Sequence, residues 1–235
     1  MNIALIIPTL NEREGLEPTI LEYKSVLKNV SILVVDGGSE DGTVDIARKL
    51  GTEVLLVGEK GKGRAIAAGL EYLRNNHEPD IVVFTDGDYT YPANKLPEMI
   101  RILENRPNVG AVIGNRLSNM PKKAFLTDAY LLGNLVIRRV YKTLRNIDLR
   151  DPLSGLRAVR WEAIREWKPV SRGFEIETEM NLYLFYRGWK IEEVPINYRK
   201  RIGRKKLRIS DAIPILLMLK DYNTNHAYSN SHRGL

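Results

Sequence analysis

The first 120 residues alternate continuous apolar runs with longer segments of helical periodicity, and this alternation constrains the fold more than any other feature. Apolar runs predict strands at residues 3–8, 32–36, 53–57, 81–85 and 109–114, and helical patterns lie between them at 14–28, 43–50, 64–75 and 96–105. Strands that are apolar throughout are buried on both faces, and their alternation with helices is typical of a parallel sheet. The sequence therefore predicts an α/β fold with a doubly wound, mostly parallel central sheet and helices on both faces.

The second half of the chain predicts more helix and fewer strands. Helices are expected at 128–145, 174–187 and 210–221, with strands near 155–159 and 191–198. A polar tail over residues 223–235 is expected to fray. The chain has 235 residues, of which 43% are hydrophobic, and this is enough for one full core. The length suits one large α/β domain or two small ones. We expect a single domain over residues 1–222.

The composition excludes several classes of site. The chain has no cysteine, which rules out a disulfide scaffold, a thiol nucleophile and a zinc site built on sulfur. It has only three histidines, so a histidine triad or a histidine-based metal site is not expected. No apolar stretch reaches about 18 residues and no leader pattern is present, so neither a transmembrane helix nor a signal peptide is expected. This pattern favours a cytoplasmic protein.

The charge of the chain is unevenly divided. The first 120 residues contain 13 Lys and Arg against 17 Asp and Glu, and the remainder contains 23 against 12, so the formal charges are −4 and +11. A basic half predicts an anionic partner, either a phosphorylated substrate, a membrane surface or a nucleic acid. The basic run at 199–208 has no aromatic RNA-binding signature beside it, so a nucleic-acid partner is not expected.

Polar segments follow four of the predicted strands, at residues 8–12, 36–41, 58–63 and 86–91. Ligands of open parallel sheets bind beyond the carboxyl ends of the strands, so these segments are the expected site. Within them, Asp86 and Asp88 flank a glycine directly after a strand. Two carboxylates in this position suit Mg²⁺ or Mn²⁺ held together with substrate phosphates. The alternative is a polar turn, because Asp and Gly are common turn residues.

Two further segments are compatible either with a nucleotide or with a plain loop. Asp36 could hold a base or a ribose hydroxyl, or its segment could be a loop with an Asp helix cap. Gly61, Lys62, Gly63 and Arg64 precede a helix, where backbone N–H groups could cradle a diphosphate. This second segment is not a P-loop, because it has no Gly-Lys-Ser/Thr, and it is a poor dinucleotide-binding fingerprint.

Two predicted helices of the second half carry apolar stripes beside basic residues. In the helix at 128–145 the stripe consists of Leu132, Val136, Val140 and Leu144. In the helix at 210–221 the large apolar residues are Ile213, Ile215, Leu216, Leu217, Met218 and Leu219. Such stripes usually pack on the core or on a second subunit, but their basic neighbours also favour binding at a membrane interface.

Together, these motifs resemble the family 2 glycosyltransferases, specifically the dolichyl-phosphate mannose synthase branch. The resemblance covers about residues 2–220 and depends on the order and spacing of short segments. These segments are 6–12, 34–43, 60–63, 86–88, 114–116, 151–155 and 198–207. The resemblance implies a GT-A fold, a nucleoside diphosphate sugar as donor, a divalent metal and a polyprenyl phosphate acceptor.

The resemblance also implies a nucleotide-sugar and metal half at 1–120 and an acceptor- and membrane-facing half at 121–222. The residues expected at the nucleotide sugar are Pro8, Asn11, Glu12, Asp36, Lys62 and Asp86. Asp86 and Asp88 would hold the metal. Arg116, Ser154 and Arg201 would lie around the acceptor phosphate, and the catalytic residues would be Asp88, Arg116 and Arg201.

Two positions depart from the family pattern. The family often has Gln two residues after the second Asp, where it helps to bind the metal, and this chain has Thr90. The basic loop usually carries Ser before Lys-Leu, and this chain has Lys205. The first departure leaves the third metal ligand and the choice of nucleotide open.

The predicted reaction transfers a hexosyl group from GDP-mannose or a UDP-hexose to dolichyl or another polyprenyl phosphate, with inversion. A phosphate monoester has a second pKa of about 6, so the acceptor is ionised and needs no general base. One of Glu175, Glu177 and Glu179 could act as a base if the acceptor were an alcohol. The alternatives are a family 2 transferase with a soluble or polysaccharide acceptor, and a non-enzymatic or nucleotidyl-transferring relative.

We expect the protein to be peripheral on the cytoplasmic face of a membrane. The predicted acceptor is a membrane lipid, and the helices at 128–145 and 210–221 carry apolar stripes near Lys and Arg. A homo-oligomer or a separate membrane-anchoring partner is also compatible with these stripes.

Overall fold

The computed structural model of the chain describes residues 1–76, 78–120, 129–204 and 209–222. Its strands are β1 (Ile3–Thr9), β2 (Val30–Asp36), β3 (Glu53–Leu56), β4 (Ile81–Phe84), β5 (Val109–Asn115), β6 (Arg157–Arg160) and β7 (Lys190–Pro195). Its α-helices are α1 (Arg13–Val26), α2 (Thr43–Lys49), α3 (Lys62–Asn76), α4 (Leu96–Asn105), α6 (Ala129–Arg145), α7 (Trp161–Ile164), α8 (Ile176–Tyr186) and α9 (Ala212–Asp221). Three 3₁₀ helices are η1 (Ala93–Lys95), η2 (Leu117–Asn119) and η3 (Ile209–Asp211). The predicted tail and Lys205 lie outside the described residues.

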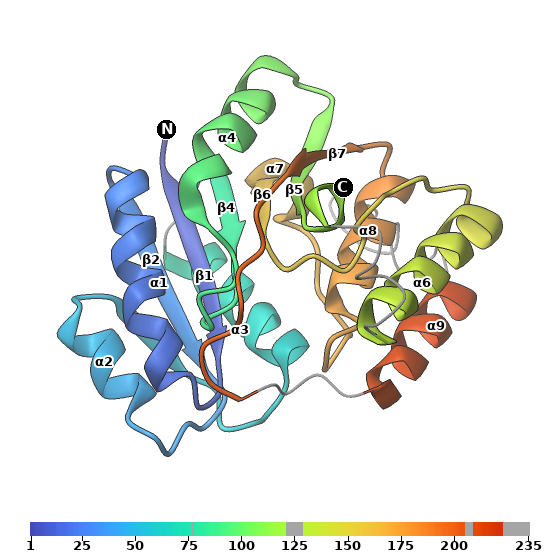
Figure 1. The fold of residues 1–235 in the computed structure, drawn as a ribbon. Coiled ribbons are helices and arrows are strands. Elements are labelled where there is room, and N and C mark those ends of the chain that lie inside the picture. Colours follow the sequence, from blue (N-terminus) through green and yellow to red (C-terminus); the bar gives the residue numbers. More distant parts are fainter. Residues whose placement is uncertain (77, 121–128, 205–208, 223–235) are drawn as a thin grey trace.

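The strands form one seven-stranded sheet in the order β3-β2-β1-β4-β6-β5-β7 (Figure 1). All pairings are parallel except those of β6, which runs antiparallel to β4 and β5. This confirms the predicted α/β fold with a mostly parallel sheet. The strand β1 lies between β2 and β4, with Thr9 opposite Asp36 and Ile6 opposite Phe84. The carboxyl ends of these three strands are therefore adjacent, and the polar segments that follow them meet.

The strands β1, β2, β4 and β5 bury side chains on both faces, as their continuous apolar sequences predict. Along β1, Ile3, Leu5 and Ile7 pack with α1 and α4, whereas Ala4 and Ile6 pack with α3, α7 and α8. Successive side chains of a strand point to opposite faces, so a strand between two helical layers must be apolar at every position. The helices thus form two layers around the sheet (Figure 1).

A third apolar cluster joins α6, α8 and α9, and it shows which apolar residues of these two predicted helices face the core. On α6, Ile137 and Tyr141 are buried in this cluster, whereas Leu132, Val136 and Leu144 are 55%, 54% and 58% exposed. Three of the four residues of the predicted α6 stripe therefore lie on its outer face, and the fourth, Val140, packs partly against the cluster. On α9 the core side chains are Ile215 and Leu219, while the exposed ones are Ile213, Leu216 and Leu217. Among the described residues, no helix combines the length and apolarity needed to cross a bilayer.

Leu219 and Leu217 provide a matched test of this assignment. Leu219→Ala should lower the free energy of unfolding by about 2–5 kcal/mol, because it leaves a cavity among α6, α8 and α9. Leu217→Ala should change it by less than about 0.5 kcal/mol, because that side chain is half exposed. Urea unfolding followed by circular dichroism measures both values. Equal losses for the two variants would contradict the placement of α9.

Candidate functional site

The loops after β1 and β2 are joined by hydrogen bonds at the carboxyl edge of the sheet. Asn11 lies between them: its N–H donates to Ser39 Oγ (2.7 Å), and its Oδ1 accepts the Glu40 N–H (2.8 Å). Asn11 adopts a positive φ of 50°, a conformation in which Asn is more easily accommodated than most residues. The Glu12 N–H donates to Thr43 Oγ1 (2.9 Å). Two of the predicted nucleotide residues therefore lie in one hydrogen-bonded loop pair.

Asp36 is buried and its carboxylate organises its own loop. Oδ1 accepts the N–H groups of Gly38 (3.0 Å) and Ser39 (2.7 Å), and Oδ2 accepts the hydroxyl groups of Thr9 (3.0 Å) and Ser39 (2.5 Å). These bonds correspond to the loop alternative of the sequence analysis. The contact of Asp36 with a nucleotide stays a prediction, and its observed role is to shape the loop beside it.

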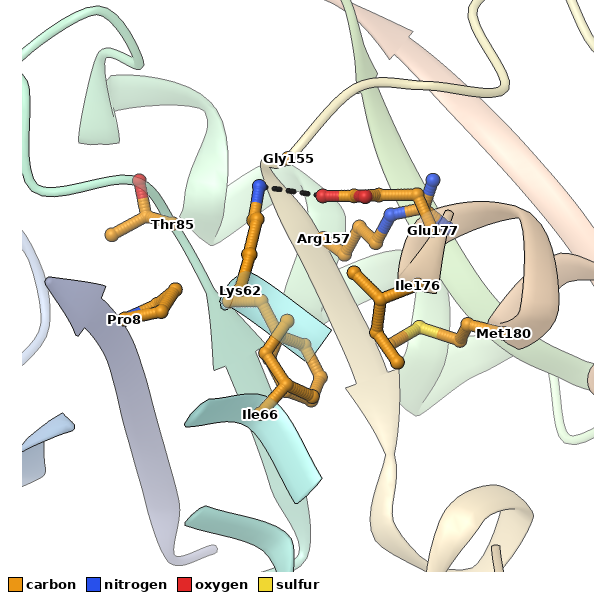
Figure 2. Close-up of a pocket in the computed structure, with 10 residues that line it drawn as sticks. Pro8, Lys62, Ile66, Thr85, Gly155, Arg157, Ile176, Glu177 and Met180 are labelled. Atoms are coloured by element: carbon orange, nitrogen blue, oxygen red, sulfur yellow. Dashed lines mark ion pairs between the residues drawn. The ribbon is translucent and has the colours of Figure 1, made fainter. Parts of the chain in front are cut away.

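Lys62 begins α3 and connects the metal motif with the second half of the chain. Its Nζ lies 2.6 Å from Asp86 Oδ1 and 2.5 Å from Glu177 Oε1 on α8. Figure 2 shows the Lys62 side chain extending toward Glu177, with Pro8 and Thr85 on its other side. Burial alone would lower the pKa of Lys62, but the two carboxylates raise it above its ordinary value, so the ammonium stays charged. Pro8 and Lys62 are thus brought together with Asp86.

Arg201 reaches the other carboxylate of the motif from the segment that follows β7. Its Nη1 lies 2.9 Å from Asp88 Oδ2, and its Nη2 pairs with Glu12 Oε1. We call residues 197–204 the strap, because the N–H groups of Arg199 and Ile202 donate to the carbonyls of Thr90 (3.0 Å) and Asp88 (3.1 Å). In Figure 1 the strap runs from β7 across the sheet toward the ends of β1 and β4.

These contacts form a cluster of six charged groups at the ends of β1 and β4. The carboxylates belong to Glu12, Asp86, Asp88 and Glu177, and the cations are Lys62 and Arg201. Four negative and two positive charges leave a formal charge of −2. Burial raises the pKa of Asp88, and the nearby Asp86 raises it further. The cluster therefore has an excess of negative charge that a divalent cation would neutralise.

The carboxylates of Asp86 and Asp88 fit a divalent metal in chemistry and in position. Both are hard oxygen ligands at the end of β4, and the side chain of Asp86 is 30% exposed. Within the described residues, no group of three His, Cys, Asp or Glu side chains is arranged to hold a metal. Thr90 donates its hydroxyl to Asp88 Oδ1 (2.5 Å) and so supports this carboxylate. Water and the diphosphate of a donor would supply the further ligands.

The glycines around Lys62 have a different role from the predicted diphosphate cradle. The N–H groups of Gly63 and Arg64 donate to the Arg172 carbonyl (3.1 and 3.4 Å), so this end of α3 is already capped. A Cβ on Gly61 would lie 2.2 Å from Arg172 O, and one on Gly63 would lie 2.3 Å from Ser171 O. The glycines allow this backbone approach, and Lys62 contributes through its side chain.

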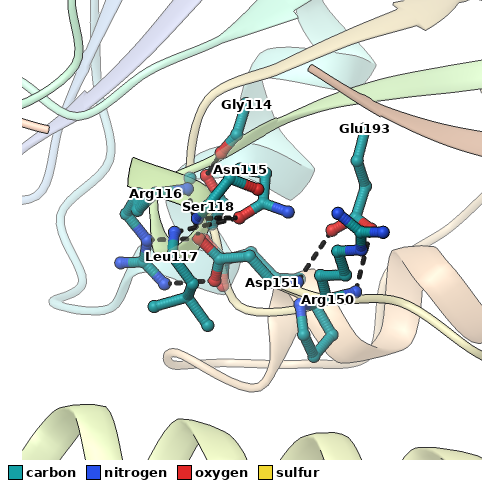
Figure 3. Close-up of polar contacts among 12 residues, drawn as sticks. Gly114, Asn115, Arg116, Leu117, Ser118, Arg150, Asp151 and Glu193 are labelled. Carbon is teal, nitrogen blue, oxygen red and sulfur yellow. Dashed lines mark hydrogen bonds and ion pairs between the residues drawn. The ribbon is translucent and has the colours of Figure 1, made fainter. Parts of the chain in front are cut away.

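Arg116 is fixed by Asp151, which is fully buried (Figure 3). The Arg116 Nε and Nη2 atoms donate to Asp151 Oδ2 (2.8 Å) and Oδ1 (2.7 Å), and the guanidinium lies 5.4 Å from the Tyr198 ring centroid. Burial alone would lower the pKa of Arg116, but Asp151 raises it well above its ordinary value. Asp151 is fixed in turn, because its N–H and that of Arg150 donate to Glu193 (2.7 and 2.8 Å). The predicted acceptor residue is therefore a charged group held rigidly in place.

Ser154 does not fit its predicted contact with the acceptor phosphate. Its side chain is fully buried, and its hydroxyl donates to the Gly114 carbonyl (2.6 Å). The adjacent Gly155 N–H donates to the Tyr91 hydroxyl (2.7 Å). Ser154 therefore holds the loop between α6 and β6 against β5.

The structure adds Glu177 and Asp151 to the residues that sequence reasoning placed in the site. Both are buried carboxylates that each hold a predicted site cation, Lys62 and Arg116 respectively. In the sequence, Asp151 belongs to one of the segments that resemble the family, but the resemblance assigns it no function. Glu177 is predicted only as a possible base. The sequence feature that indicates a role for Glu177 is the presence of acidic residues within the otherwise apolar sequence of α8.

Comparison with known proteins agrees with this architecture. The sequence model of glycosyl transferase family 2 matches residues 4–167. Glucosyl-3-phosphoglycerate synthase from Mycobacterium tuberculosis, solved with Mn²⁺, uridine diphosphate and phosphoglyceric acid, superposes with a TM-score of 0.74. The two share 21% identity over 96% of this chain and 78% of the synthase. This likeness concerns the fold alone, and the fold is GT-A, as expected.

Several curated relatives are similar along most of this chain. Glycosyltransferase AglJ of Haloferax volcanii is 34% identical over 85% of this chain and 63% of its own length. A dolichyl-phosphate hexose transferase of the same organism is 30% identical over 88% and 86%. Dolichol-phosphate mannosyltransferase of Pyrococcus furiosus is 29% identical over 88% and 60%. The chain thus spans less than two thirds of the length of the first and the third.

The packing role of Gly63 can be tested by its replacement. Gly63→Ala should lower the melting temperature by several degrees, because the new methyl group meets the Ser171 carbonyl. Gly133→Ala on α6 is the control, because nothing lies within 4 Å of its Cβ position and alanine favours a helix. Differential scanning calorimetry measures both. Unchanged stability of Gly63→Ala would contradict the close approach of residues 171–172.

Proposed function

This chain belongs to glycosyl transferase family 2, and we propose that it transfers a hexosyl group from a nucleoside diphosphate sugar to a polyprenyl phosphate such as dolichyl phosphate. The observation that carries the proposal is the charged cluster in which Lys62 and Arg201 pair with Asp86 and Asp88. Relatives named for dolichyl phosphate support the choice of acceptor. GDP-mannose and a UDP-hexose are the candidate donors.

The donor would lie at the ends of β1, β2 and β4. Mg²⁺ or Mn²⁺ bound by Asp86 and Asp88 would neutralise charge on the leaving diphosphate. Lys62 keeps its positive charge beside Asp86, which suits a site for a diphosphate. The hydrogen-bonded loops at Asn11 and Asp36 would border the nucleoside.

In the proposed reaction, a phosphate oxygen of the acceptor attacks the anomeric carbon of the donor sugar. The bond from this carbon to the diphosphate oxygen breaks, and the nucleoside diphosphate leaves with the electron pair. The acceptor is already ionised near neutral pH, so no proton has to be removed. The carboxylates of Glu12, Asp151 and Glu177 are paired with cations, and none is placed as a nucleophile. A single displacement with inversion follows.

The acceptor phosphate needs cations that hold it close to an anionic donor. Arg116 is suited to this role, because its two bonds to Asp151 fix the guanidinium before any ligand arrives. A group that is already oriented loses little freedom on binding and can favour the attacking geometry. Arg201 is the second candidate, since the strap holds it next to Asp88.

The exposed apolar side chains of α6 and α9 support a position on the surface of a membrane. Leu132 and Val136 lie on the same outer face of α6 as Arg139. On α9, Leu217 and Lys220 share the outer face. Apolar groups beside basic ones fit the interface of an anionic bilayer. We therefore propose that the protein is peripheral at the cytoplasmic face of a membrane.

Replacement of the strand-end carboxylates tests the reaction. Asp86→Ala and Asp88→Ala should each nearly abolish the release of nucleoside diphosphate from GDP-mannose or a UDP-hexose in the presence of dolichyl phosphate and Mn²⁺. Asp80→Ala is the control, because Asp80 lies before β4 at the opposite end of the same strand. Melting curves establish that each variant is folded. Full turnover of either site variant would contradict the assignment.

The wild-type enzyme distinguishes the proposed acceptor from the alternatives. Transfer to dolichyl phosphate supports the proposal. Strong transfer to a water-soluble sugar or phosphate acceptor, with none to the lipid, would instead identify a transferase of soluble acceptors. Release of inorganic pyrophosphate in place of a nucleoside diphosphate would identify a nucleotidyl transfer.

Membrane binding can be measured by sedimentation with phosphatidylglycerol vesicles. The wild type should sediment with them at low salt and be partly released at high salt, because salt screens the basic groups. Leu132→Ser with Val136→Ser should lose this binding without a lower melting temperature, since both side chains are exposed. The control, Leu56→Ser, changes an exposed leucine of β3 and should bind like the wild type. Equal sedimentation of all three proteins would contradict the assigned face.

A further inference from the structure

The two carboxylates of the metal motif differ in how they are engaged. Lys62 contacts Asp86 through Oδ1, and the Asp86 side chain is 30% exposed. Both oxygens of Asp88 are used: Oδ1 accepts the Thr90 N–H (3.1 Å) and hydroxyl (2.5 Å), and Oδ2 pairs with Arg201 (2.9 Å). The Asp88 side chain is only 4% exposed. Arg201 therefore occupies Oδ2, the oxygen that Thr90 leaves open, and a metal bound at this oxygen would compete with it.

Arg201 is the partner that can leave without disturbing the local backbone. Thr90 belongs to the same turn as Asp88 and contacts it through two groups. Arg201 belongs to the strap, which other contacts keep in place: the N–H groups of Arg199 and Ile202 bind the backbone of residues 88–90, and the Arg199 guanidinium pairs with Glu22. Arg201 also pairs with Glu12 through Nη2, so its Nη1 can leave Asp88 while the strap and this second ion pair keep the side chain near the site.

We propose that Arg201 occupies Asp88 in place of the metal, and that binding of the metal with the donor displaces Arg201 toward the acceptor phosphate. This inference rests on the proposed function and adds a coupling between its two substrates. The same guanidinium neutralises Asp88 in the absence of the metal and becomes available to the acceptor once the donor site is filled. Donor and metal would then bind before the acceptor, and each would raise the affinity for the other by the same factor.

A supporting role for Arg201 and a competing role predict opposite changes in metal affinity when Arg201 is replaced. If Arg201 held Asp88 in the orientation that the metal needs, its removal would weaken metal binding. If Arg201 competes with the metal, its removal should strengthen metal binding. Arg199 is a matched control, because it lies on the same strap and carries the same charge, but pairs with Glu22.

The first experiment is a calorimetric titration of the full chain with Mn²⁺ alone. Arg201→Gln should bind Mn²⁺ about tenfold more tightly than the wild type, because a charge-assisted contact no longer competes. Arg199→Gln should stay within about twofold, because Arg199 pairs with Glu22 and the variant keeps the backbone hydrogen bonds that dock the strap. Arg201→Lys keeps the charge and should fall between Arg201→Gln and the wild type. Melting curves establish that each variant is folded.

The second experiment measures binding of a water-soluble short-chain isoprenyl phosphate. In the wild type, Mn²⁺ with GDP or UDP should increase its affinity several-fold, and this increase should disappear in Arg201→Gln. Weaker or unchanged Mn²⁺ binding by Arg201→Gln would overturn the proposal, as would the absence of Mn²⁺ binding in every protein or equal tightening in Arg199→Gln. Hexosyl transfer by the wild type is scored separately, so the coupling can fail while the proposed function stands.

Discussion

The site depends on the concentration of negative charge where β1 and β4 end. Asp86 and Asp88 lie close together, with Glu12 and Glu177 beside them, and such a group is stable only when cations neutralise it. Lys62 comes from the start of α3, and Arg201 comes from the strap near the other end of the chain. The ion pairs therefore join distant segments, in addition to the backbone hydrogen bonds that dock the strap on Asp88 and Thr90.

The alternation of apolar runs and helices was sufficient to predict the α/β fold and its mostly parallel sheet. The order of the strands explains why the strand-end segments could also be predicted, because β1 lies between β2 and β4. The direction of β6 could not be predicted, because the sequence of a strand as short as Arg157–Arg160 does not indicate which strands it pairs with. The spacing of the apolar residues on α6 also left open whether they face the core or a membrane. In the structure Leu132, Val136 and Leu144 are exposed, whereas Ile137 and Tyr141 form the core face.

Side-chain partners were the least predictable part of the site. Three glutamates at the start of α8 are spaced by two in the sequence, yet each binds a different partner. They are Glu175, Glu177 and Glu179. Glu175 accepts N–H groups of the preceding loop, Glu177 pairs with Lys62, and Glu179 accepts the indole N–H of Trp167 (3.1 Å). They point to different partners because they lie at the start of a helix whose neighbours differ on each side. Their roles depend on tertiary packing, which spacing alone does not encode.

The position of β6 has a consequence for how the chain folds. β6 is formed by residues 157–160, but it lies between β4 and β5, which come from the first 120 residues. In the described sheet, β5 pairs only with β6 and β7, so a fragment that stops at residue 120 would leave β5 with no neighbouring strand. The acidic and basic halves are thus not separable folding units. The strands of the sheet can all pair only after most of the chain has been synthesised. Such long-range pairing is typical of slow-folding topologies.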